Sequence, residues 1–249
     1  MFDLLKRLFR RQSAPAKPVL DEHEGTHVRP HLDQSVRTHW MFPPKTVVDP
    51  AAWDQYWLDQ LSHGVAEFVD IFVDDGQLVD AMRANGLRTV LCVGNGISLE
   101  PYALAWAGFD VTALDISPLA ATVLRDVEPP EDFLAQLVGG RSCGQEGRME
   151  IVVGDLSNPA CCPGPYDVVI ERKTLQLWPD GDRPMAVQAV VNRMAHRGIF
   201  FSQAHDGRWR PPAPRRHAVT PWFLEHGWKF WEGQSLLTER VVWPFTTTG

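Results

Sequence analysis

The sequence predicts an α/β fold, in which a mostly parallel sheet is covered by helices on both faces. Short apolar runs with the length of buried strands alternate along the chain with segments of helical spacing. A glycine turn, Gly94-Asn95-Gly96, directly follows the first of these runs, Val90 to Val93. Ligands of open parallel sheets bind where the carboxyl ends of the strands meet. We therefore expect a ligand site at this edge, beginning at the glycine turn.

Composition limits the classes of protein that this chain can represent. Its 249 residues suit one large domain with an N-terminal extension. The net charge of −7 and the thin spread of Lys and Arg argue against a nucleic-acid partner. The four cysteines contain no C-x-x-C pair, which favours reduced thiols and a cytoplasmic location: Cys92, Cys143, Cys161 and Cys162. The start of the chain lacks the apolar run of a signal peptide.

Residues 1–64 are predicted to form an arm that ends in a lid helix, followed by the main domain at 65–249. Residues 2–11 place apolar and basic side chains on opposite sides of a short helix, which suits weak contact with an anionic membrane or a protein. The alternative is a frayed or docked terminal helix. Residues 13–45 are rich in Pro, His and charge, and we expect an extended arm there.

Three histidines in this arm recur at every fourth position, as metal ligands on one helix face do: His23, His27 and His31. Gly25 and Pro30 disfavour the helix that would align them. No metal site is therefore predicted.

The segment Pro50 to His63 has a stronger helical pattern. Asp49 can cap this helix, and Pro50 suits its first turn. Its aromatic stripe includes Trp53 and Trp57, which indicates either core packing or a lid that excludes water from a ligand. Both tryptophans are candidate substrate contacts.

The remaining elements follow in chain order. Before the insertion-like segment 127–147, we expect helices at 65–85, 102–107 and 117–124 and strands at 90–93 and 109–114. After it, we expect strands at 149–153, 166–170 and 198–202 and helices at 183–195 and 221–226. The β-rich segments 228–231 and 240–243 are predicted to pair antiparallel at one edge of the sheet.

Three of the predicted strands are followed by an acid: Asp115, Asp155 and Glu171. Asp115 lies about twenty residues after the glycines, the distance at which the second strand presents a carboxylate to a ribose diol. Enzymes that bind dinucleotides and enzymes that bind S-adenosylmethionine share this feature.

The residues after the glycine turn separate these two ligands. Leu99 stands where the dinucleotide fingerprint has its third glycine, and Glu100 opens the next helix. A carboxylate there opposes a pyrophosphate, which needs open amides and positive potential. An acidic pocket mouth suits the positive sulfonium and amino groups of S-adenosylmethionine. A nicotinamide oxidoreductase is therefore disfavoured.

The motif VLCVGNG, with the acids downstream, resembles the class I S-adenosylmethionine-dependent methyltransferases over roughly residues 65–245. The resemblance implies a Rossmann-like, seven-stranded sheet with a C-terminal antiparallel hairpin. It also implies S-adenosyl-L-methionine as cofactor, with contacts from the turn and the strand ends: Gly94, Asn95, Gly96, Asp115, Ile116, Asp155, Leu156 and Glu171. Cys92 and Ser98 depart from the family pattern, at positions that usually carry an acid and a glycine.

A second, local resemblance favours a small-molecule acceptor. The run ERKTLQLWP from Glu171 to Pro179 is similar to the segment after the fourth strand of thiopurine methyltransferases and related thiol methyltransferases. The Asp/Asn-Pro-Pro-Tyr/Phe motif of amino-directed nucleic-acid methyltransferases is absent from the sequence.

Methyl displacement needs an aligned nucleophile and a water-poor site more than acid-base groups. Glu171, His205 and Asp206 are the candidate catalytic residues, although His205-Asp206-Gly207 also reads as a simple turn. Arg172 and Lys173 suit either an acidic substrate group or surface ion pairs.

The sequence thus predicts a cytoplasmic methyltransferase that acts on a small molecule. A protein methyltransferase and a catalytically silent scaffold that binds S-adenosylmethionine are the alternatives.

Overall fold

The computed structural model describes residues 48–62, 77–140, 147–172, 174–202, 228–230 and 243–247. In the order of the chain, the first elements are α2 (Pro50–Ser62), α3 (Gln77–Ala84), β1 (Thr89–Val93), α4 (Glu100–Trp106), β2 (Asp110–Asp115), α5 (Pro118–Arg125) and α6 (Glu131–Leu137). They are followed by β3 (Met149–Val153), β4 (Tyr166–Glu171), the 3-10 helix η4 (Leu175–Leu177), α7 (Arg183–Val191), β5 (Met194–Ser202), β6 (Trp228–Phe230) and β7 (Trp243–Thr247).

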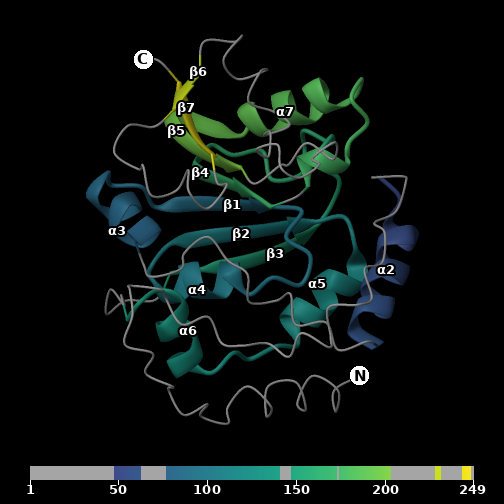
Figure 1. Ribbon diagram of the computed structural model, residues 1–249, viewed down its shortest axis with the longest axis horizontal. Helices are drawn as coiled ribbons and strands as arrows, with labels where there is room; N and C mark the ends of the chain where they lie inside the picture. The colour runs from purple at the N-terminus through teal and green to yellow at the C-terminus, as the bar shows by residue number, and fades with distance from the viewer. Residues whose placement is uncertain are drawn as a thin grey trace, which may run out of the picture.

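One sheet organises the molecule, with the strand order β3-β2-β1-β4-β5-β7-β6 (Figure 1). β1 pairs in parallel with β2 on one side and with β4 on the other, and β3 and β5 continue the parallel pairing outward. The chain therefore winds in one direction from β1 to β3 and crosses back to β4. This reversal beside β1 is a topological switch point, where open α/β sheets bind ligands. The α/β, Rossmann-like part of the predicted fold is confirmed.

Side chains of β1 alternate between the two faces of the sheet and enter different cores. Val90 and Cys92 belong to a cluster with α4 and α6, whereas Leu91 and Val93 belong to a cluster with α7. Each of these four β1 side chains is at most 3% exposed. Burial of such a side chain contributes about 1.5–3 kcal/mol, which explains why this strand reads as a continuous apolar run.

The two C-terminal strands join the sheet beyond β5. β7 pairs antiparallel with β5, with Phe201 opposite Pro244, and β6 pairs antiparallel with β7. The predicted second segment, 240–243, overlaps β7 only at Trp243, and residues 240–242 lie outside the described part of the chain. Proline has no N–H, so it does not continue a central strand. Pro244 is accommodated because β6 pairs only with residues 245–247 of β7.

Two other expectations differ from the structure. The segment 127–147 was expected to be irregular, but it contains α6, whose acidic first turn after Pro130 favours a helix start and whose Leu134 enters the core. α7 ends at Val191 and not at Ala195, because Met194 already pairs with Tyr166 and begins β5.

Several predicted segments are not part of the described chain: the arm and helix at 1–47, most of the helix at 65–85, and the helix at 221–226. Within the described ranges, no helix is long and apolar enough to cross a membrane.

Candidate functional site

The turn after β1 requires glycine at both predicted positions. Gly94 and Gly96 have φ angles of +59° and +55°, in the left-handed region that L side chains rarely adopt. A Cβ on Gly94 would lie 2.9 Å from Cβ of Thr174, and a Cβ on Gly96 would lie 2.7 Å from Cη2 of Trp57. The two glycines therefore bring the backbone of the turn against two other segments, the loop after β4 and the helix α2.

Asp115, at the end of β2, is tied directly to this turn. Its Oδ2 accepts a hydrogen bond of 2.6 Å from the N–H of Gly96, and its Oδ1 accepts one of 2.8 Å from the N–H of Ser117. Burial raises the pKa of this carboxyl above its usual value, and the amides of Ser117, Gly96 and Ile116 act in the opposite direction. The sequence-predicted residues Gly96, Asp115 and Ile116 therefore lie together at one edge of the sheet.

The end of β3 joins the same edge. The N–H of Gly154 donates to the carbonyl of Asp115 over 2.9 Å, which places Asp155 and Leu156 directly after a strand-end contact. The Oδ1 of Asp155 accepts from the N–H of Ser157 over 2.8 Å, and the side chain of Leu156 is buried against the core that β1 shares with α7. The acid and the apolar residue after β3 thus lie one strand beyond Asp115, as predicted.

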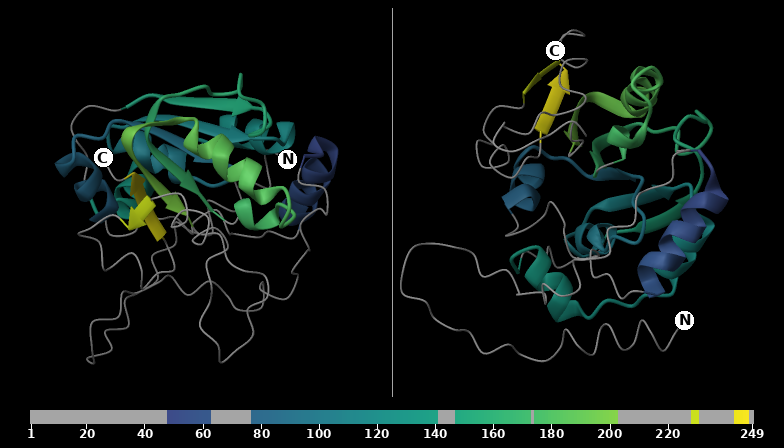
Figure 2. Two further views of the ribbon diagram at one scale, coloured as in Figure 1. Left: turned by 90° about the horizontal axis from the view of Figure 1, so that it is seen from above. Right: turned by 45° about the vertical axis from the view of Figure 1, so that its right-hand side comes forward.

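Helix α2 covers the site through a residue that the sequence analysis missed. Oδ1 of Asp54 accepts hydrogen bonds from Oγ of Ser117 over 2.5 Å and from the N–H of Leu119 over 2.9 Å. These donors lie at the start of α5, where Ser117 is itself the N-cap. Both views of Figure 2 show α2 running beside α5. A carboxylate of α2 thus serves as a second cap for α5.

Trp57 lies on the same helix, one turn after Asp54. Its ring packs against Gly96, and its side chain joins a cluster that includes Leu61 and Ile97. The indole Nε1 is buried and has no hydrogen-bond partner within the described part of the chain. Trp53 makes an edge-to-face contact with Tyr56, with ring centroids 5.3 Å apart. The lid position predicted for Trp57 is therefore consistent with its packing over the turn.

Glu171 ends β4 in an enclosed position. Its side chain is 0% exposed, Oε2 accepts from the N–H groups of Thr174 and Leu175 at 3.0 and 3.2 Å, and Oε1 accepts from the hydroxyl of Ser202. Such a carboxylate fixes the start of the next segment. In this arrangement it offers no open face to a ligand.

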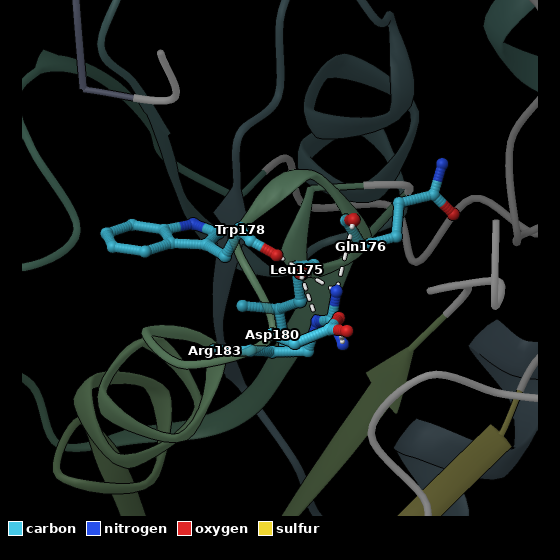
Figure 3. A network of polar contacts seen from close by, with 5 residues as sticks. All are labelled: Leu175, Gln176, Trp178, Asp180 and Arg183. Carbon is cyan, nitrogen blue, oxygen red and sulfur yellow. Dashed lines mark hydrogen bonds and ion pairs between the residues drawn. The ribbon is translucent and has the colours of Figure 1, made fainter. Parts of the chain in front are cut away.

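Arg183 holds the other end of that segment (Figure 3). Its guanidinium donates to the carbonyls of Leu175 and Trp178 at 3.1 and 2.9 Å, and it forms an ion pair of 2.9 Å with Asp180. The short helix η4 is therefore fixed by an acid at its first amides and by a cation at the carbonyls of Leu175 and of its C-cap, Trp178. From the sequence, Arg183 was expected only to begin a helix. The only sequence feature that indicates its contacts with η4 is its position two residues after the Asp180-Gly181 turn.

Two residues near the turn have a different setting from the one expected. Glu100 is only 2% exposed, so its carboxylate does not line an open mouth. Burial, together with the neighbouring charge of Glu100, raises the pKa of the Cys92 thiol well above its usual value. Cys92 is therefore a neutral core residue beneath the turn.

Of the remaining residues predicted to bind substrate or to act in catalysis, only Arg172 lies in the described part of the chain. Arg172 is partly buried directly after Glu171. Lys173, His205, Asp206 and the segment 2–11 lie outside the described residues. Among the described residues, no cluster of His, Cys, Asp or Glu is suited to hold a metal ion.

Comparisons with known proteins agree with this architecture. No family model matches the chain. The magnesium-protoporphyrin O-methyltransferase of Rhodobacter capsulatus is 31% identical over 117 residues, which represent 46% of this chain and 44% of that protein. The chain thus spans less than half the length of this curated relative.

Solved structures extend the comparison to most of the chain. The magnesium protoporphyrin IX methyltransferase of Synechocystis PCC 6803, solved with bound S-adenosylmethionine, gives a TM-score of 0.51 at 20% identity over 85% of this chain and 100% of that chain. A TehB-like S-adenosylmethionine-dependent methyltransferase of Corynebacterium glutamicum gives a TM-score of 0.47 at 18% identity over 81% of this chain and 100% of that chain.

The chain has the fold of the class I S-adenosylmethionine-dependent methyltransferases. The resemblance predicted from the motif around Gly94 and Gly96 is therefore confirmed.

Proposed function

We propose that this protein is a methyltransferase that uses S-adenosyl-L-methionine and acts on a small-molecule acceptor by direct displacement. The observation that carries the proposal is the contact between Gly96 and Asp115, which joins the glycine turn to the acid after β2 over 2.6 Å. The fold to which this contact belongs binds S-adenosylmethionine in the magnesium protoporphyrin IX methyltransferase of Synechocystis.

The residues present fit this cofactor. Gly94 and Gly96 form the tight turn with positive φ angles that follows β1 at the switch point of the sheet, and Asp115 lies beside it. We assign the ribose hydroxyls to Asp115 and the purine to Asp155 and Leu156, with Asn95 and Ile116 beside them. Binding at Asp115 favours the ionised carboxylate, which its amide hydrogen bonds already stabilise against burial.

The cofactor supplies an activated methyl group, so the chain needs chiefly to align the acceptor and to exclude water. We assign exclusion of water to α2, with Trp53 and Trp57 facing the acceptor. Arg172 and Lys173 would bind an acidic group of the acceptor. Glu171 is proposed as a positioning residue, because its carboxylate already accepts hydrogen bonds from Thr174, Leu175 and Ser202.

His205 and Asp206 remain the candidates for a general base, which is needed if the acceptor must lose a proton.

The small-molecule acceptor is supported by the curated relative, a magnesium-protoporphyrin O-methyltransferase. We also assign β6 and β7 to the antiparallel closing pair of the seven-stranded methyltransferase sheet, with residues 65–249 as the cofactor-binding domain and 1–64 as arm and lid.

Calorimetric titration with S-adenosylhomocysteine tests the proposal. The wild-type chain is expected to bind, and Asp115→Ala is expected to reduce the affinity at least about tenfold, because a charged acceptor at the ribose contributes roughly 1.5–3 kcal/mol. Asp110→Ala is the matched control at the opposite end of β2, where the carboxylate accepts from the N–H of Arg148, away from the glycine turn. Absence of binding by the wild type, or equal affinities for wild type and Asp115→Ala, would contradict the proposal.

A further inference from the structure

A buried arginine, Arg193, lies between α7 and β5, and only 2% of it is exposed. Within the described ranges its guanidinium forms no ion pair, and each of its hydrogen bonds goes to a main-chain carbonyl. Burial of a cation without a counter-ion is costly unless its donors are satisfied. The carbonyls that satisfy these donors therefore indicate what the residue holds in place.

The guanidinium of Arg193 joins the end of α7 to the loop between β3 and β4. Nη1 donates to the carbonyl of Ala189 in the last turn of α7 over 2.6 Å, where the helix dipole also favours a cation. Nη2 donates to the carbonyls of Asn158 and Cys161 at 2.7 and 2.9 Å, and Nε donates to that of Cys161 over 3.1 Å. Such a set of contacts needs the planar fork of an arginine, which the single ammonium group of a lysine does not reproduce.

The two loop carbonyls that Arg193 binds end two consecutive turns. The N–H of Asn158 donates to the carbonyl of Asp155 over 3.0 Å, and the N–H of Cys161 donates to the carbonyl of Asn158 over 3.0 Å. The loop also packs back on the end of β3, because a Cβ on Gly154 would lie 2.6 Å from Sγ of Cys161. Arg193 therefore fixes the path of the chain that begins at Asp155.

The main chain of Arg193 holds the other end of the same segment. Its carbonyl accepts a hydrogen bond of 2.8 Å from the N–H of Tyr166, the first residue of β4. The segment between Asp155 and Tyr166 is thus fastened at its middle by the side chain of Arg193 and at its end by the backbone of the same residue.

Asp155 keeps one carboxylate oxygen for a ligand. Oδ1 accepts from the N–H of Ser157 over 2.8 Å, whereas Oδ2 has no hydrogen-bond partner among the described residues. The direction of Oδ2 is set by the turn that Asp155 begins, and this turn ends at Asn158, which Arg193 binds.

We propose that Arg193 is a positioning residue of the cofactor site, which orients the carboxylate of Asp155 through the loop without touching the ligand. The inference rests on the proposed function, in which Asp155 contacts the purine. A carboxylate accepts a hydrogen bond from the 6-amino group of adenine and repels a 6-oxo oxygen, which is itself only an acceptor. The direction of Asp155 therefore decides how well the site separates these two purines.

Two probes that differ at position 6 of the purine test the inference. S-adenosylhomocysteine and S-inosylhomocysteine are titrated by calorimetry into the wild type, Asp155→Ala and Arg193→Lys. The wild type is expected to prefer the adenine compound at least about tenfold, and Asp155→Ala is expected to lose most of this preference. Arg193→Lys keeps the charge but lacks the fork, so the preference is expected to fall at least about threefold.

A double variant shows whether Arg193 acts through Asp155. If it does, Arg193→Lys combined with Asp155→Ala has the same preference as Asp155→Ala alone, because the two substitutions remove one effect. Arg193→Gln is a second variant that removes the buried charge and keeps an NH₂ donor, and it serves if the lysine variant does not fold.

Arg125→Lys is the matched control. Arg125 donates Nη2 to the carbonyl of Ile151 over 2.8 Å, which is a contact of the same kind in the middle of β3 and outside the loop. Its replacement is expected to leave the preference between the two probes unchanged. Thermal unfolding of each variant gives the temperature below which the folded proteins are compared.

The outcomes separate this inference from the proposed function. An unchanged preference in the Arg193 variants, or equal losses of affinity for both probes, would overturn the inference while the wild type still binds S-adenosylhomocysteine. A further loss of preference in the double variant would also overturn it, because Arg193 would then act by another route. Failure of the wild type to bind either probe would overturn the inference together with the proposed function.

Discussion

The loops at the carboxyl edge of the sheet fall into two halves that use their polar groups differently. In the half formed by β1 and β2, Asp115 accepts only backbone amides, and Trp57 retains an unpaired N–H above the turn. In the half formed by β4 and β5, the carboxylate of Glu171 is enclosed by η4 and Ser202, and Arg183 closes the same segment from its other end. The first half uses its carboxylate to join the glycine turn to the start of α5, whereas the second half uses its charged groups to hold a loop.

The comparison predicts that substitutions in the β4–β5 half reduce stability, and that substitutions in the β1–β2 half reduce ligand affinity. Three changes test this division in decreasing order of expected effect.

Glu171→Ala is expected to have the largest effect on the free energy of unfolding. It leaves the N–H groups of Thr174 and Leu175 and the hydroxyl of Ser202 without their buried acceptor, which costs about 3–5 kcal/mol. Urea denaturation measures this loss.

Glu171→Gln is the conservative control. Its amide oxygen can still accept from the two N–H groups, and the Ser202 hydroxyl can accept from its NH₂, so most of the lost stability should return. A stable Glu171→Gln protein with weakened binding of S-adenosylhomocysteine would break the comparison, because it would make Glu171 a ligand contact.

Arg183→Met is expected to lower the free energy of unfolding by about 2 kcal/mol. The carbonyls of Leu175 and Trp178 lose charge-assisted hydrogen bonds, while the methionine retains most of the apolar stem. The shift of the urea midpoint reports the change.

Asp180→Ala separates the loop contacts from the ion pair. Asp180 is 71% exposed, so loss of its ion pair with Arg183 should cost less than about 0.5 kcal/mol. Equal losses in Asp180→Ala and Arg183→Met would show that the ion pair, and not the carbonyl contacts, fixes η4.

Asp54→Ala, the third of these changes, is expected to lower the free energy of unfolding by about 1 kcal/mol, which is typical of losing a helix cap. It should also reduce the affinity for S-adenosylhomocysteine roughly fivefold, because α2 would no longer be anchored at Ser117 and Leu119. Calorimetry and thermal unfolding together measure both effects.

Two variants of the same helix sharpen this test. Asp54→Asn keeps the accepting oxygen and should behave like the wild type, and Asp59→Ala removes an acid whose carboxylate accepts from Gln55 within α2. Unchanged ligand affinity in Asp54→Ala would show that the docking of α2 does not contribute to the site.

Strand β1 and the glycine turn after it were predictable from the sequence because their signals are local. An apolar run such as Val90 to Val93 followed by Gly94 identifies a buried strand and its turn without knowledge of any partner. The position of Asp115 at the end of the second strand followed from the spacing that a βαβ unit imposes. Its hydrogen bond with Gly96 is seen only in the structure.

The positioning residues were not predictable in this way. Asp54 meets Ser117 across 63 positions of the chain, and nothing near Asp54 in the sequence indicates that contact. Glu171 was predicted to face a ligand because it ends a strand, as Asp115 does. Only the three-dimensional path of residues 174–177, which fold back over the carboxylate, distinguishes the two acids.

The hydrogen bonds from Asp54 through Ser117 and Asp115 to Gly96 also bear on where the sheet domain starts. A domain boundary drawn by composition falls after residue 64 and assigns α2 to the arm. A chain shortened at that boundary would keep every strand of the sheet, yet it would lose the second cap of α5 and the ring that covers Gly96. The described contacts therefore make α2 part of the same packed unit as the sheet, and not of the arm.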